Sequence, residues 1–161
     1  MAIDAALYKQ VMRRYATGVM VLTVRDGDDF HAVTVNSVTS VSLEPILLLL
    51  CLEKNARSHE LMQEAKTFAL NIMADAQVEL GKKFAYDRAA RSAPRAQSAH
   101  FVSERGELLF ENALGYFECR VVAAYAGGDH TIFLGEVVNA AVSETDANPL
   151  IYYQSDWKGL R

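Results

Sequence analysis

Residues 30–53 constrain the fold more than any other stretch of the chain, because their pattern changes twice along FHAVTVNSVTSVSLEPILLLLCLE. Residues 30–38 predict a strand whose side chains alternate between two faces, one of them largely polar. Residues 37–42 carry four hydroxyl side chains and predict a loop that ends before Pro45. Residues 46–52 form an unbroken apolar run, which is typical of a strand buried on both faces. Two strands are therefore expected to flank a loop rich in hydroxyl groups and backbone amides.

Two further pairs of strand-like segments are separated by turn residues. Residues 19–24 precede Asp26-Gly27-Asp28-Asp29 and the strand from residue 30, and residues 114–126 and 131–142 flank Gly127-Gly128-Asp129-His130. Residues 67–73 and 150–153 add shorter strands, and strands and helices do not alternate regularly. These features predict a single domain over residues 1–161, mainly β with added helices and built as a closed antiparallel barrel.

Three helices are expected around this barrel. Asp4 is a suitable N-cap for the first, which should pack on the barrel and end near Gly18. A short helix over residues 60–66 has Asn55 or Ser58 as its candidate cap, and Asp75 precedes a helix over residues 76–85. Residues 86–106 show no regular pattern and predict a solvated excursion, although a loop of this length can also be functional.

The charge balance bears on the class of partner. Sixteen Lys and Arg face twenty Asp and Glu, a formal net charge of −4, which argues against nucleic acid or an anionic membrane as the main partner. Any bound phosphate must therefore be held by a local group of residues. The N-terminal segment lacks the continuous apolar core of a signal peptide and no apolar run is long enough to span a bilayer, so we expect a cytoplasmic protein.

The residues that most often bind metals show no ligand spacing. Cys51 and Cys119 sit in apolar runs, as reduced buried thiols do, and the four histidines are scattered. We therefore predict no metal site. The chain also lacks a nucleophile elbow, a Rossmann glycine motif and a P-loop, so a nucleotide cofactor would have to be bound by the barrel itself.

Several motifs, taken together, resemble those of the short-chain flavin reductase family. In chain order they are Gly18-Val19 with Val21-Leu22-Thr23, Thr34-Val35-Asn36-Ser37, Thr39-Ser40-Val41-Ser42-Leu43 before Pro45, Phe68-Ala69-Leu70-Asn71-Ile72 followed by Gln77, and Gly128-Asp129-His130-Thr131 followed by Gly135-Glu136-Val137. The resemblance covers nearly the whole chain. It implies an FMN-binding split barrel, FMN or FAD and NADH or NADPH as cofactors, and a role as the reductase component of a two-component monooxygenase.

The resemblance also implies a flavin site. The residues expected along the flavin ring and ribityl chain are Thr34, Val35, Asn36, Ser37, Ser40 and Val41, and those expected toward the phosphate are Cys51, Glu53, Asn55, Arg57 and Ser58, with Phe84 as a weaker match. A guanidinium, a hydroxyl and free N–H groups at a helix N-terminus suit an anion. Read without the family, the hydroxyl-rich segment is a hydrogen-bonded corner and Arg57 is an ordinary exposed charge.

The turn formed by Gly128, Asp129 and His130 is the sharpest short motif. In the family the histidine lies near the nicotinamide, which implies that His130 positions that cofactor and that Asp129 orients the imidazole. Hydride transfer between the two cofactors requires alignment above all. A simple hairpin corner is the alternative interpretation of these three residues.

The leading interpretation of the sequence is an NAD(P)H-dependent reductase that releases reduced FMN or FAD to a separate oxygenase. Two alternatives remain open: a flavoprotein that keeps its FMN and acts on an organic substrate, and a non-enzymatic flavin- or haem-binding module. The resemblance further implies a homodimer. Candidate contacts between its subunits are the first helix and the aromatic residues Tyr152, Tyr153 and Trp157. Aromatic residues near a terminus can equally pack within their own subunit.

Overall fold

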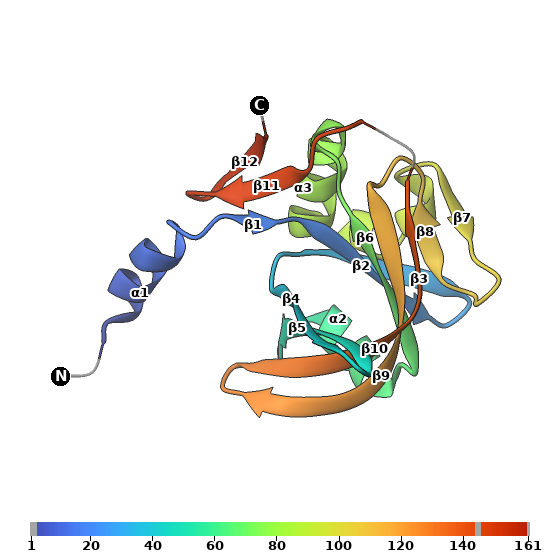
Figure 1. The fold of residues 1–161 in the computed structure, drawn as a ribbon, viewed down its shortest axis with the longest axis horizontal. Helices are drawn as coiled ribbons and strands as arrows, with labels where there is room; N and C mark the ends of the chain where they lie inside the picture. The colour runs from blue at the N-terminus through green and yellow to red at the C-terminus, as the bar shows by residue number, and fades with distance from the viewer. Residues whose placement is uncertain (1–2, 144–145, 161) are drawn as a thin grey trace.

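The computed structural model describes residues 3–143 and 146–160. Within them the chain is mainly antiparallel β-sheet with a few short helices, as predicted (Figure 1). The largest sheet has, in spatial order, β3 (Asp29–Val35), β2 (Met20–Asp26), β6 (Thr67–Ile72), β9 (Gly115–Gly127), β10 (His130–Val142), β5 (Ile46–Glu53) and β4 (Val38–Leu43). Both predicted hairpins are present, because Asp26 pairs with Asp29 and Gly127 pairs with His130.

The sheet separates two hydrophobic cores, and strands β2 and β3 contribute buried residues to both. On β2, Leu22 belongs to the core inside the curved sheet together with Phe133, whereas Val21 points the other way. That second core contains Phe84 and Phe110, which come from segments that cover the outside of the sheet. A strand buried on both faces needs apolar residues at successive positions, which explains the apolar run in residues 19–24.

The two edges of the large sheet are β3 and β4. Only Asn36 and Ser37 separate these strands in sequence, yet no ladder joins β3 to β4 in the part of the chain that the structure describes. The pairing of β4 with β5 is extended by one bond, from the Cys51 N–H to the Ser37 carbonyl at 3.2 Å. The predicted closure of the barrel is therefore not confirmed by the hydrogen-bond pattern, while its antiparallel β character is.

The predicted loop over residues 37–42 is wrong. Val38–Leu43 is strand β4, paired with β5 from Val38 to Leu43 with a register shift between Ser40 and Ser42. Leu43 pairs with Ile46, so that Glu44 and Pro45 make a two-residue turn. Small polar side chains are compatible with an exposed edge strand, because the backbone ladder, not the side chains, holds such a strand in place.

The apolar run of β5 is buried on one face only, which corrects the prediction of two buried faces. Leu48, Leu50 and Leu52 are at most 5% exposed, whereas Leu47, Leu49 and Cys51 on the other face are half-buried. In the single chain, the outer face of β5 therefore retains partly uncovered apolar surface.

The first helix, α1 (Ala5–Met12), is capped as predicted, since the Asp4 carboxylate accepts a hydrogen bond from the Ala6 N–H at 3.0 Å. It ends well before Gly18, and none of its residues is buried. Figure 1 shows α1 projecting from the body of the molecule, so the prediction that it packs on the barrel is wrong for the single chain. Its apolar stripe required a partner surface but did not specify which one.

The other helices also differ from their predicted bounds. α2 (Arg57–Glu64) begins earlier than expected, and its N-cap is Ala56 without a side-chain hydrogen bond, so neither Asn55 nor Ser58 caps it. The helix predicted over residues 76–85 is a 3₁₀ turn, η1 (Asp75–Gln77), followed by α3 (Val78–Tyr86).

Residues 86–106 are not a solvated excursion. They form α4 (Arg88–Arg91), a 3₁₀ turn η2 (Pro94–Ala96) and β7 (His100–Val102), which pairs with β8 (Leu108–Phe110). Ala90 and Pro94 are buried, and α4 and η2 pack against β3. Isolated small apolar residues cover this edge strand, which is why no periodic pattern revealed the segment.

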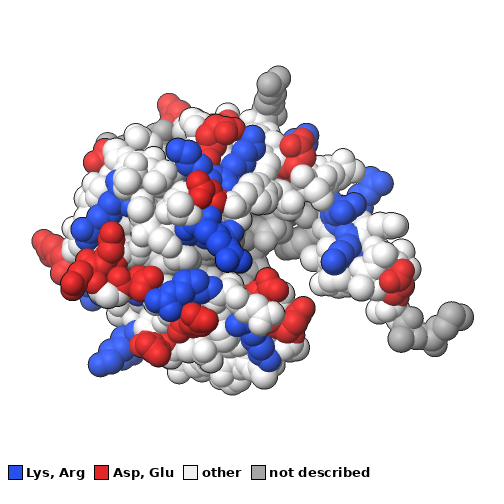
Figure 2. Space-filling model, turned by 180° about the vertical axis from the view of Figure 1, so that it is seen from behind, with Lys and Arg blue, Asp and Glu red and all other residues white. Residues whose placement is uncertain are grey.

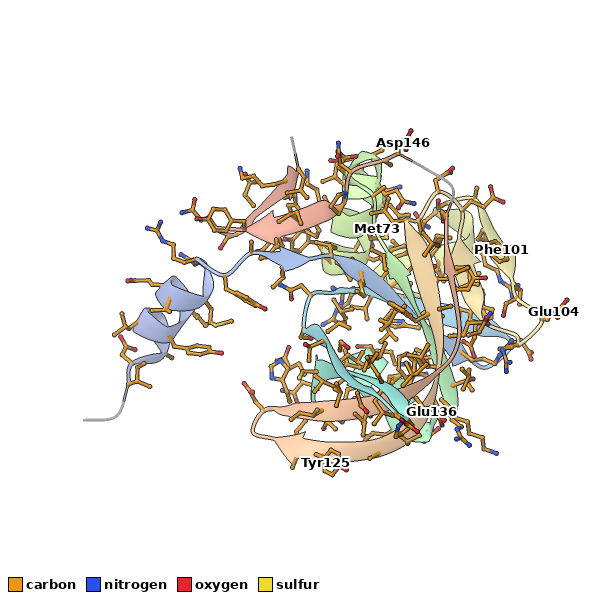
Figure 3. The ribbon with its side chains drawn as sticks, in the orientation of Figure 1. Met73, Phe101, Glu104, Tyr125, Glu136 and Asp146 are labelled. Atoms are coloured by element: carbon orange, nitrogen blue, oxygen red, sulfur yellow. The ribbon has the colours of Figure 1, made fainter. Side chains whose placement is uncertain are left out.

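The C-terminal segment forms a small separate sheet of β1 (Thr17–Gly18), β11 (Leu150–Tyr153) and β12 (Asp156–Gly159). A Cβ added to Gly81 of α3 would lie 3.3 Å from the side chains of both Leu150 and Trp157, so α3 rests directly on this sheet. Met73, labelled in Figure 3, is fully buried between these elements, whereas Tyr125 projects from the β9–β10 hairpin and is 57% exposed. Among the described residues, no helix has the length and apolar character needed to cross a membrane.

Candidate functional site

The corner between β3 and β4 holds four of the predicted site residues and is tied to three other elements. The Thr34 hydroxyl donates to the Gly81 carbonyl of α3 at 2.6 Å. The Asn36 amide donates to the Thr17 hydroxyl of β1 at 3.1 Å, and the Ser37 hydroxyl donates to the Cys51 carbonyl of β5 at 2.8 Å. These hydrogen bonds tie the corner, where the chain passes from one edge strand of the sheet to the other, to α3, β1 and β5.

A cavity of about 190 Å³ opens beside this corner. Its lining combines Thr34, Val35 and Asn36 with side chains from four other segments: Val19, Ala85, Tyr86, Tyr152 and Trp157. The Trp157 ring packs edge-on against Tyr152 at 5.4 Å and against Tyr86 at 6.4 Å between centroids. An apolar and aromatic wall with a few convergent polar groups suits a planar aromatic ligand.

Sequence reasoning missed Tyr86 and assigned the terminal aromatics to a subunit contact. Tyr86 lies at the end of α3, and only the packing of α3 on the C-terminal sheet brings it to Trp157. The sequence around Tyr86, Tyr152 and Trp157 gives no indication that the three rings line one cavity.

A second cavity, of about 290 Å³, lies farther along β3. It contains the predicted residues Asn55, Arg57 and Ser58 together with His31, Arg88, Arg91 and others from the start of α2 and from α4. His31 and Thr34 are separated by roughly 10 Å along an extended strand. One edge strand therefore carries an aromatic cavity near one end and a cationic cavity near the other.

The remaining predicted residues lie outside these two cavities. Ser40 and Val41 are on β4, where Val41 is 48% exposed at the register shift. Cys51 is half-buried on the outer face of β5, and burial raises the pKa of its thiol, which keeps it protonated. Phe84 is fully buried against Phe110 with ring centroids 5.4 Å apart, so its ring supports α3 from the core side.

The Gly128, Asp129 and His130 residues form the tip of the β9–β10 hairpin. Gly128 has φ +73°, a conformation that glycine adopts without strain. Lys54, which directly follows β5, holds the tip through its N–H to the Asp129 carbonyl at 3.0 Å and its ammonium to the Gly128 carbonyl at 2.6 Å. The register pairs His130 with Glu53, so the hairpin tip lies beside the end of β5.

The imidazole of His130 is oriented by its neighbour. His130 Nδ1 lies 2.7 Å from Asp129 Oδ1, and because a carboxylate can only accept, Nδ1 is the donor. The hydrogen bond from the His130 ring lowers the pKa of Asp129. The His130 side chain is 44% exposed, and its Nε2 has no partner among the described residues. The ring is thus presented to solvent with one nitrogen free to meet a ligand.

Taken together, the lining residues of the two cavities on β3 would suit a ligand that has an aromatic end and an anionic end. Residues 12–161 match the family model described as the flavin reductase like domain. The chain belongs to the flavin reductase-like family.

Individual relatives agree with this assignment. The chain is 34% identical over 155 residues to the NADH-dependent FMN reductase AsuE2 of Streptomyces nodosus subsp. asukaensis, covering 96% of this chain and 84% of that protein. It is 36% identical over 155 residues to the reductase component of an FADH(2)-dependent resorcinol hydroxylase from a Rhizobium species, covering 93% and 84%. The structure of NADH:FAD oxidoreductase SgcE6 from Streptomyces globisporus C-1027 with NAD and FAD fragments matches with a TM-score of 0.89 at 31% identity, over 98% of this chain and 93% of that one.

The residues present fit a flavin in their chemistry. Neutral aromatic and apolar groups line most of the first cavity, while the second is lined by arginines and the start of α2, together with the Glu60 carboxylate that pairs with Arg57. Nδ1 of His31 is buried without a hydrogen-bond partner among the described residues, which leaves it available to a polar group of a ligand.

Proposed function

We propose that this chain is an NADH-dependent flavin reductase that transfers a hydride from nicotinamide C4 to flavin N5 and releases reduced FMN or FAD to a separate flavin-dependent monooxygenase. The likeness to SgcE6, whose structure holds NAD and FAD fragments, is the observation that carries this proposal. The relative that serves a resorcinol hydroxylase supports the oxygenase partner. NADPH is the alternative nicotinamide substrate.

In this proposal, the flavin lies along β3 with its ring toward the aromatic cavity and its phosphate toward α2. Thr34, Val35, Asn36 and Ser37 border the ring and ribityl chain, with Ser40 and Val41 beyond them on β4. Asn55, Arg57 and Ser58 border the phosphate. Cys51 and Glu53 on β5 and Gly128 in the neighbouring hairpin turn are assigned to the same side of the flavin, outside the lining of that cavity. Phe84 acts by supporting the wall.

The nicotinamide is assigned to the hairpin tip. His130 offers Nε2 from a ring that Asp129 holds in one tautomer, so His130 is the contact residue and Asp129 the positioning residue. The reaction consumes one hydride from NADH and one proton from water and yields NAD⁺ and reduced flavin. The chemistry belongs to the two substrates, and the protein supplies binding and alignment.

Two further parts of the proposal concern architecture. In this proposal the chain is a flavin-binding split barrel, and the open edges at β3 and β4 are its split. The barrel forms a single domain. A homodimer would cover the exposed stripe of α1, where Leu7 is 51% and Val11 is 61% exposed. Figure 2 shows a hollow between the arm that bears α1 and the body of the molecule, which supports an occupant from a second copy. We assign the enzyme to the cytoplasm.

The test is an anaerobic assay of purified protein with NADH and excess free flavin, followed by loss of visible flavin absorbance. A reductase bleaches many equivalents of added flavin, and the reduced flavin regains its colour when air is admitted to the protein-free filtrate. Bleaching confined to flavin that copurifies with the protein would support the retained-FMN flavoprotein. If neither NADH nor NADPH bleaches the flavin, the non-enzymatic flavin- or haem-binding module remains as the function.

A further inference from the structure

The first turn of α2 carries a buried imidazole that neither the flavin site nor the nicotinamide site of the proposed function uses. His59 is 5% exposed and lies three residues after the N-cap Ala56. Its backbone N–H donates to the Ala56 carbonyl at 3.0 Å, so the residue is fixed within the helix. Buried polar side chains nearly always have a hydrogen-bond partner. The partner of the His59 ring identifies the element that the ring holds in place.

That partner lies on the strand that begins at His130. The distance between His59 Nε2 and Thr131 Oγ1 is 2.8 Å, and both residues are buried. The His59 ring also packs edge-on against Phe133, with ring centroids 5.7 Å apart. Thr131 and Phe133 lie on the same face of β10, because side chains alternate along a strand. One imidazole therefore anchors the start of β10 through a polar contact and an aromatic contact.

His130 belongs to the same short stretch of β10 but faces the opposite way. Its side chain is 44% exposed, whereas the next residue, Thr131, is buried against His59. Lys54 donates two hydrogen bonds to the turn just before His130. Lys54 thus holds the chain before His130, and His59 holds the residue after it. The backbone of His130 is fixed from both sides.

The contact joins two parts of the molecule that the sheet does not join. The ladders pair β10 with β9 and β5, and they leave the position of the hairpin relative to α2 unspecified. The start of α2 lines the cavity of about 290 Å³ through Arg57 and Ser58. His59 is the next residue along the helix. One helical turn therefore faces that cavity with two side chains and holds β10 with the third.

We propose that His59 and Thr131 are positioning residues for hydride transfer: their hydrogen bond fixes His130, and with it the nicotinamide, relative to the flavin. The inference rests on the proposed flavin reductase function and adds to it two residues that contact neither substrate. Placement matters because the reacting atoms must approach to about 3–3.5 Å with aligned orbitals. Loss of the contact should lower kcat and raise KM for NADH while the affinity for flavin stays nearly unchanged.

The first test replaces Thr131 by Val, which keeps the shape of Thr without its hydroxyl group. Anaerobic reduction of saturating FMN is measured at varied NADH. We expect kcat/KM for NADH to fall about fivefold or more, because the buried imidazole loses its partner and β10 its anchor. Thr23→Val is the matched control, since the fully buried Thr23 hydroxyl donates to the Leu108 carbonyl at 2.7 Å on β2, which pairs with β3 and β6. It should lose stability and keep the NADH kinetics of the parent protein.

The second test changes the other partner. His59→Phe keeps a ring against Phe133 and removes the hydrogen bond, whereas His59→Gln keeps an amide close to the place of Nε2. His59→Phe should reproduce the NADH defect of Thr131→Val, and His59→Gln and Thr131→Ser should each recover part of it. The double variant of His59→Phe with Thr131→Val should not show the sum of the two losses, because both substitutions remove the same contact.

Melting curves of the flavin-free variants and quenching of flavin fluorescence separate placement from folding and from flavin binding. The positioning role is overturned if Thr131→Val loses stability but keeps the NADH kinetics of the parent, if it fails to fold, or if weaker FMN binding accounts for its whole defect. Additive losses in the double variant would overturn it as well. The parent protein tests the underlying function, because a parent that does not reduce flavin removes the reductase, whereas an active parent with an equally active Thr131→Val removes only the positioning role.

Discussion

Gly135 offers a test of how tightly the inner core is packed beneath the hairpin that carries His130. A Cβ at this position of β10 would lie 2.6 Å from Phe68 Cζ, 3.1 Å from Phe68 Cε1 and 3.3 Å from Cys119 Cβ. Phe68 and Cys119 are both 0% exposed. The shortest of these contacts is far below van der Waals separation, so Gly135→Ala forces the Phe68 ring or the β10 backbone to move.

The expected cost follows from overpacking a buried site. One extra methyl group in a filled core costs about 1–3 kcal/mol, and the upper half of that range applies because a buried aromatic ring has little room to rotate away. For a domain of this size, each kcal/mol lowers the melting temperature by about 2–4 °C. We expect Gly135→Ala to lower it by roughly 4–12 °C.

Urea unfolding of the flavin-free protein, followed by circular dichroism, measures the change at constant m-value. Gly18→Ala is the control, because no atom lies within 4 Å of a Cβ added there. Phe68→Leu in the Gly135→Ala background should recover part of the loss, so the two substitutions should be less than additive. Unaltered stability of Gly135→Ala, or strict additivity with Phe68→Leu, would refute the packing argument.

Three further predictions concern the site, a buried carboxyl and the exposed helix. His130→Ala should raise KM for NADH and lower kcat with flavin affinity nearly unchanged, as steady-state kinetics and flavin titration can show; unaltered kinetics with reduced stability would make His130 a turn residue. Burial raises the pKa of Glu107, and a hydrogen bond from Thr67 opposes this effect. The folded state therefore holds the Glu107 proton more tightly than the unfolded state does. This contribution to stability is lost as the pH rises through the folded-state pKa. Glu107→Gln should therefore gain in unfolding free energy relative to the parent between acidic and neutral pH, and a pH-independent difference would contradict the burial argument. The double substitution of Leu7→Glu with Val11→Glu should give a folded monomer where the parent protein is a dimer, as the molar mass from light scattering can show. A parent protein that is itself monomeric would rule out α1 as a dimer contact.

Elements governed by neighbours in sequence were predictable from the sequence alone. The Asp4 cap of α1 and both hairpin turns depend on residues within a few positions of one another, and each is present in the structure. Local hydrogen bonding and backbone preference are sufficient to specify such features.

The bounds of β4, the one-sided burial of β5 and the exposure of α1 were decided only by tertiary structure. Each depends on which surface lies opposite, and a periodic apolar pattern shows that a face is suited to burial without naming its partner. The second cavity shows the same limit, because His31 and Arg88 meet only after α4 packs on β3. The Arg57 guanidinium contacts the Asp26 carboxylate of β2 at 2.8 Å, a pairing across the fold that lowers the net charge that Arg57 offers to an anion.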